Sequence, residues 1–161
     1  MMMMPEAQKE HRWLQQLVGE WTFEATPCAT PGQPATKQQG TQAIRSIGDL
    51  WVQGEGQGEM PGGGAATMII TLGFDPQKQR FVGTWVGSMM THLWVYDGAL
   101  DPAGKVLTLN AEGPSMSGNG MAKYQDIIEL KSDDHHTLTA RMLGDDGTWT
   151  QVMAADYRRK R

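Results

Sequence analysis

The hydrophobic pattern of the chain changes its period once, near Gly19. Before this glycine, apolar residues recur at helical spacing, which predicts a short amphipathic helix from about Glu6 to Leu17. The side chains at or near its apolar face are His11, Trp13, Leu14, Leu17 and Val18. After Gly19 apolar and polar residues alternate, as in a β-strand with one buried face. Gly19 itself stands where a glycine commonly follows the end of a helix.

The period of two continues to the end of the chain. Short alternating or apolar segments are separated by clusters of Gly, Pro, Asp and Ser, at the spacing of about 8 to 12 residues that is typical of hairpin-connected strands. Longer turn-forming stretches occupy residues 27–37, 58–64 and 113–120. The predicted strands are residues 20–26, 40–47, 50–57, 65–74, 81–88, 91–100, 105–112, 121–131, 137–143 and 148–157.

These elements predict an all-β fold. Strands do not alternate with helices, so we expect an antiparallel meander and no parallel sheet. A meander of about ten strands has two exposed edges, which closure into a barrel removes. A barrel of about eight to ten strands can leave room for one small ligand. We therefore expect one domain over residues 1–161, a single antiparallel β-barrel with a short N-terminal helix, and disorder over residues 1–5.

The junction of helix and first strand carries a family signature. Gly19-Glu20-Trp21 resembles the Gly-x-Trp motif of the lipocalins and their calycin relatives. The resemblance implies that the helix plugs the base of a lipocalin-like barrel, that Trp21 packs beneath it, and that an arginine from a late strand lies over Trp21. Arg158 is the best positional match for this arginine, and Arg141 is the second.

A wider resemblance covers most of the chain. The strings LVGEWTFEA, ITLGFDPQKQRFVGTWVGSMMTHLWVYDGALD, AEGP and DGTW, followed by Tyr157-Arg158, resemble a bacterial family known as the domain of unknown function number fifteen seventy-nine. That family is grouped with calycin-like barrels. The resemblance implies a fold but no established activity, so it assigns no catalytic residue.

Composition and charge exclude several classes of protein. Lys and Arg number 14 against 18 Asp and Glu, a net charge of −4, which argues against nucleic acid as a partner. One cysteine, Cys28, excludes an intrachain disulfide and a multi-cysteine metal site. No apolar run is long enough to span a membrane, and the Met-rich N-terminus lacks the features of a signal peptide. We therefore expect a cytoplasmic protein with Cys28 as a reduced thiol in a loop.

Candidate ligand-binding residues follow from the strand faces. In the predicted strand 91–100, His92, Trp94 and Tyr96 share one face. We expect the apolar lining or floor of the barrel to include Trp21, Trp85, Met90, Trp94 and Tyr96. Polar residues within apolar strands are candidates for polar contacts with a ligand: Arg45, Asp126 and Arg141 have such positions, and we select Arg45, Arg141 and His92 as the polar ligand-binding residues. An inward arginine would pair with a carboxylate of the ligand.

Other chemistry has weaker support. Asp133, Asp134, His135 and His136 fit a solvated turn better than a metal site, so no metal and no cofactor is predicted. Haem with His92 as its axial ligand is an alternative. Seven methionines, suited to irregular apolar surfaces, fit a ligand cavity and a packed core equally well. They are Met68, Met89, Met90, Met116, Met121, Met142 and Met153.

Three functions remain open at this point. The first is binding of a small apolar or amphipathic molecule inside the barrel. The second is a structural role, as a homodimer of barrels that their own side chains fill. The third is an enzyme, an isomerase or hydrolase, that uses His92 as its base; the sequence does not decide whether the protein is one.

Overall fold

The structure is a computed structural model that describes residues 4–27, 37–60 and 63–161. Residues 1–3, part of the segment expected to be disordered, lie outside the described residues. So do Cys28, most of the predicted loop 27–37, and two positions of the predicted turn 58–64.

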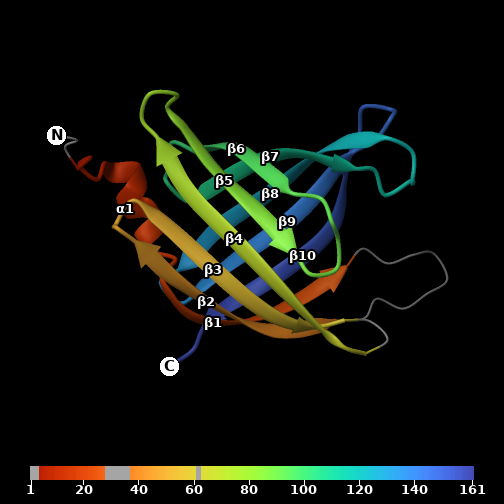
Figure 1. Ribbon diagram of the computed structural model, residues 1–161, viewed down its shortest axis with the longest axis horizontal. Helices are drawn as coiled ribbons and strands as arrows, with labels where there is room; N and C mark the ends of the chain where they lie inside the picture. Colours follow the sequence, from red (N-terminus) through yellow and green to blue (C-terminus); the bar gives the residue numbers. More distant parts are fainter. Residues whose placement is uncertain (1–3, 28–36, 61–62) are drawn as a thin grey trace.

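Ten antiparallel strands within the described residues form a closed barrel (Figure 1). Each strand pairs with its neighbours in sequence, and β1 pairs with β10 to close the ring. The predicted all-β antiparallel barrel is therefore confirmed. The strands are β1 (Gly19–Pro27), β2 (Gln38–Ile47), β3 (Trp51–Glu59), β4 (Ala65–Asp75), β5 (Arg80–Gly87), β6 (Trp94–Leu100), β7 (Val106–Pro114), β8 (Met121–Ser132), β9 (His135–Leu143) and β10 (Trp149–Arg159).

Several strands begin a few residues away from the predicted positions, and the structure explains two of these differences. β6 begins at Trp94 and not at Thr91, because a turn closed by Met90 N–H donating to Gly87 O delays the strand. β9 begins at His135, earlier than expected, because a bulge in β8 brings Ser132 opposite His135. The two histidines expected in a solvated turn are therefore strand residues.

The short helix α1 (Lys9–Gln15) covers one end of the barrel, which we call the base (Figure 1). Leu14 of this helix has no exposed surface. Trp13 Nε1 donates a hydrogen bond of 2.7 Å to Gly104 O in the β6–β7 turn. His11 accepts the Gln8 backbone N–H at Nδ1, which leaves Nε2 to donate to Phe74 O at 3.0 Å. These contacts fix the helix across the base.

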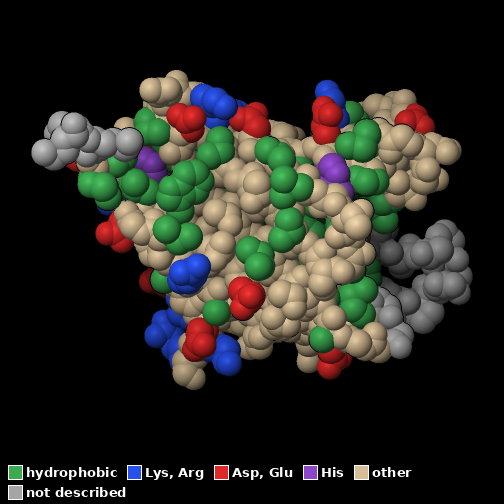
Figure 2. Space-filling view, in the orientation of Figure 1, with side chains coloured by type: hydrophobic (Ala, Val, Ile, Leu, Met, Phe, Trp, Pro, Cys, Tyr) green, Lys and Arg blue, Asp and Glu red, His purple; other side chains and the backbone are tan. Residues whose placement is uncertain are grey.

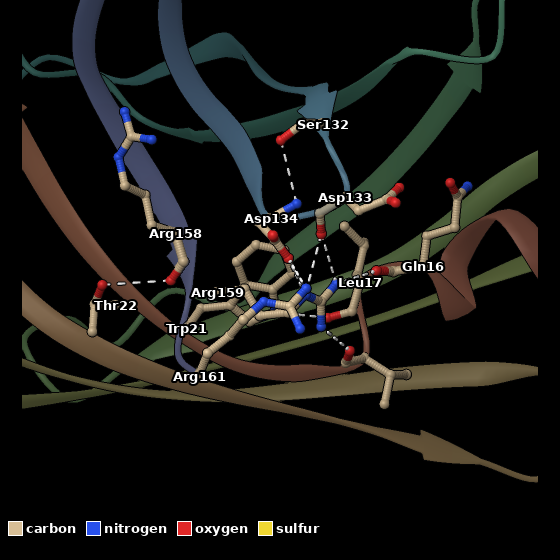
Figure 3. Close-up of polar contacts among 11 residues, drawn as sticks. Gln16, Leu17, Trp21, Thr22, Ser132, Asp133, Asp134, Arg158, Arg159 and Arg161 are labelled. Atoms are coloured by element: carbon tan, nitrogen blue, oxygen red, sulfur yellow. Dashed lines mark hydrogen bonds and ion pairs between the residues drawn. The ribbon is translucent and has the colours of Figure 1, made fainter.

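Arg159 completes the base from the last strand. Its guanidinium lies over the Trp21 ring, 4.3 Å from the centroid, while Trp21 Nε1 donates to Leu17 O. The Arg159 guanidinium also donates hydrogen bonds to the carbonyl oxygens of Val18, Gln16 and Asp133 (Figure 3). One side chain thus links the end of the helix, the β8–β9 turn and the C-terminal strand.

The prediction that Arg158 or Arg141 lies over Trp21 is wrong. Adjacent strand residues point to opposite faces, and Arg159 shares the inward face of β10 with Ala155 and Tyr157. Arg158 is exposed and points away from the cluster in Figure 3. The motif glycine, Gly19, has a φ of 141°, a conformation that residues other than glycine rarely adopt, and a Cβ there would also lie 2.3 Å from Arg159 Nη1.

Candidate ligand-binding cavity

The end of the barrel opposite α1 is hollow. A cavity of about 300 Å³ opens there, above a base filled by residues such as Leu72, Leu107 and Leu109. Its wall is mostly apolar and aromatic. The side chains that form most of it are Phe23, Ala25, Ala66, Met68, Trp85, Met89, Met90, Trp94, Ala111, Tyr124, Leu138, Ala140, Met153, Ala155 and Tyr157.

Glycines on neighbouring strands give two of the wall rings their positions. A Cβ on Gly113 of β7 would lie 2.2 Å from the Trp94 ring, and one on Gly40 of β2 would lie 2.3 Å from the Phe23 ring. Each ring therefore packs directly over a glycine, and a larger residue in place of that glycine would displace the ring. Trp94 is also held edge-to-face against Tyr124, with ring centroids 4.9 Å apart. The aromatic wall is built by close packing and not by loops.

Asp126 is the polar group deep in the cavity. It comes from β8, on the inward face between Tyr124 and Ile128, and it accepts a hydrogen bond of 2.5 Å from the Tyr96 hydroxyl. Burial raises the pKa of the Asp126 carboxyl, and the hydrogen bond from Tyr96 offsets part of that rise. Burial, followed by the charge of Asp126, raises the pKa of Tyr96 well above its ordinary value. Asp126 and Tyr96 thus form a hydrogen-bonded polar pair deep in a mainly apolar chamber.

His136 lies beneath the cavity, inside the barrel. It stacks on Tyr157 with ring centroids 4.8 Å apart and meets Trp21 edge-to-face at 4.3 Å. Burial, with smaller contributions from His135 and Arg159, lowers its pKa to about 4. Its Nδ1 is buried without a hydrogen-bond partner among the described residues. The expectation of a solvated His136 is wrong, because β9 has already begun at this residue and its side chain points into the barrel.

Four of the predicted ligand-binding residues meet at the cavity. Trp85, Met90, Trp94 and Tyr96 all line it, although they come from two strands and the turn between them. Trp21 is buried at the base, as expected of a floor residue, and does not reach the cavity. The alternation of aromatic residues along β6 is the sequence signal that predicted Trp94 and Tyr96.

The predicted polar ligand-binding residues lie elsewhere. Arg45 is exposed on the outer face, where Nη2 donates to Gln53 Oε1 at 2.8 Å. Arg141 is also on the outer face, over Trp149 and bonded to Gln125. Each arginine follows directly after an inward residue, Ile44 or Ala140, and alternation therefore turns it outward.

His92 does not line the cavity either. It precedes β6, in the segment where strand alternation has not begun, and its Nε2 lies 2.9 Å from Glu112 O. Its ring meets Trp94 edge-to-face at 4.8 Å, on the outer side of the wall. The prediction of His92 as a polar ligand-binding residue is corrected by this placement.

The seven methionines do not all lie at the cavity. Met68, Met89, Met90 and Met153 line it, and Met89 and Met90 are partly exposed there. Met116 and Met121 are exposed and Met142 is half-buried, and none of these three is a lining residue. Sequence reasoning left cavity and core equally open, and the structure assigns only part of the set to the cavity.

Neither a metal-binding cluster nor a membrane-spanning helix is present in the part of the chain that the structure describes. No group of three or more His, Cys, Asp or Glu side chains within that part of the chain is arranged to hold a metal ion. None of the helical segments described is both long and apolar enough to cross a membrane.

Fold and site together define a ten-stranded antiparallel β-barrel protein with a helix-covered base and an apolar cavity at the other end. Within that class, the chain belongs to the family described as a protein of unknown function, DUF1579, which matches residues 6–159. The family predicted from the sequence is therefore confirmed. A search of curated proteins found no match.

Solved structures with the same fold share little sequence with this chain. The S-type phycobiliprotein lyase CPES from Guillardia theta is 10% identical, with a TM-score of 0.62 over 96% of this chain and 99% of its own. Rv2717c from M. tuberculosis is 13% identical, with a TM-score of 0.61 over 97% and 100%. EF1p2_mFAP2b bound to DFHBI is 16% identical, with a TM-score of 0.51 over 94% and 100%. At these identities the likeness shows the fold.

Proposed function

We propose that the protein binds a small apolar or amphipathic molecule in the cavity at the open end of its barrel. The observation that carries the proposal is the cavity itself, about 300 Å³ and walled by aromatic and methionine side chains. Ligand sites in proteins are commonly concave, mainly apolar and supplied with few polar groups. Asp126 and Tyr96 would supply the polar contact here.

The fold is consistent with this role. EF1p2_mFAP2b, which shares the fold, was solved bound to DFHBI, and another neighbour is a phycobiliprotein lyase. These are properties of those proteins. They support the proposal only by showing that a barrel of this fold can bind a small molecule.

The two alternatives have less support. A structural homodimer of filled barrels is disfavoured by an open cavity, although apolar side chains such as Val86 and Val95 do stand on the outer face. Figure 2 shows hydrophobic side chains among the polar ones on the face turned to the viewer. The enzymatic alternative relied on His92 as a base, and His92 lies outside the cavity.

Calorimetric titration with a neutral probe, 4-phenylbutan-1-ol, tests the proposal. We expect saturable binding of one molecule per chain. Ala140→Phe fills part of the cavity and should weaken binding by roughly tenfold or more, because the added ring takes the space of the probe. Thr139→Phe, its matched control on the outer face of β9, should leave the affinity within about threefold. Absence of saturable binding, or equal effects of the two variants, would contradict the proposal.

A further inference from the structure

The charged side chains that line the cavity are all acidic in the described residues. Asp126 lies deep inside and Glu59 lies near the opening, and no Lys, Arg or His is among the described lining residues. The sequence of residues 28–36 and 61–62 holds no charged residue. The cavity therefore presents one sign of charge to a ligand, and acidic groups within low-dielectric walls concentrate that field.

Asp126 has no cationic partner within the described structure. Its one hydrogen bond comes from the neutral Tyr96 hydroxyl to Oδ2, and Oδ1 accepts none from any described residue. Burying a carboxylate without a cation is costly, and a ligand that brings a positive charge would remove that cost. On the neighbouring strand β9, Arg141 faces outward and is occupied there by Gln125 and Trp149. His136 of the same strand lies beneath the cavity, and burial lowers its pKa to about 4, so it brings no positive charge at neutral pH.

The walls suit the same kind of group. Tyr96 and Tyr157 lie with Asp126 in the inner part of the cavity, and Trp85 and Trp94 lie nearer the opening. Faces of Trp and Tyr rings attract cations, most strongly where water is excluded. The aromatic wall can therefore pack against the apolar part of a ligand and also stabilise a positive group on it.

Building on the proposed function, we infer that the cavity selects a small amphipathic amine, with its ammonium group bonded to the Asp126 carboxylate and its apolar body between the wall aromatics. The sequence had suggested the opposite polarity, in which an inward arginine meets a ligand carboxylate. The outward arginines and the inward aspartate reverse that expectation.

Three probes with one carbon skeleton test the inference: 4-phenylbutylamine, 4-phenylbutan-1-ol and 4-phenylbutyrate, titrated calorimetrically at neutral pH. We expect the amine to bind at least about tenfold more tightly than the alcohol, the usual gain from a charge-assisted hydrogen bond, and the carboxylate to bind weakest. Asp126→Asn keeps an acceptor for Tyr96 and should bring the amine to within about threefold of the alcohol.

Two controls separate the inference from other effects. Asp145→Asn removes an equal charge from an exposed turn and should leave the preference for the amine unchanged. Binding of the alcohol to Asp126→Asn reports that this variant is folded. If the alcohol binds and the amine has no advantage, or keeps its advantage in Asp126→Asn, the inference is overturned while the proposed function stands. If none of the three probes binds, both are overturned.

Discussion

At the scale of single residues, two side chains near the base show how burial and alternation assign roles. Arg159 faces inward and its guanidinium contacts the helix end, the β8–β9 turn and the Trp21 ring. His136 faces the interior and stacks on Tyr157 without a partner for Nδ1. Each has a neighbour in sequence, Arg158 or His135, of the same chemistry on the outer face. In each pair, the outward residue can therefore serve as the control for a substitution of the inward one.

The first prediction compares the two arginines. Arg159→Ala should lower the free energy of unfolding by about 2–3 kcal/mol, because several hydrogen bonds and the contact with Trp21 are lost together. Arg158→Ala should change it by no more than about 0.5 kcal/mol. Urea unfolding of both variants measures the difference. Equal losses would mean that the base does not depend on Arg159.

The second prediction concerns pH. The pKa of His136 is about 4 in the folded protein against 6.5 for an ordinary histidine, so between these values the unfolded chain takes up a proton that the folded one excludes. The stability that this group contributes is therefore complete above pH 6.5 and is lost as the pH falls toward 4. The loss over that window is about 3 kcal/mol.

The raised pKa of Asp126 acts in the opposite direction, because at pH values between the ordinary carboxyl pKa and the raised one its carboxyl keeps a proton in the folded state that the unfolded chain releases. The measurement is therefore a difference between wild type and His136→Phe, a variant that keeps an aromatic ring against Tyr157 and does not titrate. Urea unfolding across this pH range should show the steeper fall in the wild type. Parallel curves would exclude His136 as the source.

At the scale of elements, the alternation of apolar and polar residues predicted most of the barrel. Gly, Pro and Asp clusters marked its turns, and each predicted strand corresponds to one of β1 to β10, with most starts within two residues and the largest difference at β6. The starts of β6 and β9 depend on different features: a local turn after Gly87 delays β6, and a bulge in the pairing of β8 with β9 brings the start of β9 forward. The bulge belongs to the pairing of two strands, which the local sequence pattern does not display.

Strand alternation also explains why only part of the candidate site was predicted from the sequence. Trp94 and Tyr96 were predicted because aromatic residues at a spacing of two share one strand face, and both line the cavity together with Trp85 of the preceding strand. Arg45 and Arg141 were misplaced because a residue adjacent to an inward one points outward. Asp126 could have been preferred, since Tyr124 and Ile128, its neighbours at a spacing of two, are both large and apolar.

The third prediction separates the base from the cavity. Leu14→Ala removes a fully buried side chain of α1 and should lower the free energy of unfolding by about 2–5 kcal/mol. Affinity for 4-phenylbutan-1-ol should stay within about threefold at a temperature where the variant is folded, because the cavity lies at the other end. Lys9→Ala, exposed on the same helix, is the control. A folded Leu14→Ala protein that no longer binds would contradict this division.

At the scale of the whole molecule, the barrel is packed at one end and hollow at the other. Leu14, Trp21 and Leu107 fill the base, and aromatic and methionine side chains leave a cavity at the mouth. A packed end holds the strands in register, which allows the other end to keep a cavity without loss of the fold. This asymmetry, and not any one residue, is what the proposed binding function depends on.

The most direct test of that function is NMR of the protein labelled with ¹³C at its methionine methyl groups, titrated with 4-phenylbutan-1-ol. The account predicts saturable shifts for Met68, Met89, Met90 and Met153, which line the cavity, and none for Met116 and Met121, which are exposed elsewhere. Shifts confined to the exposed methionines, or no saturable shift in the first group, would contradict binding inside the barrel.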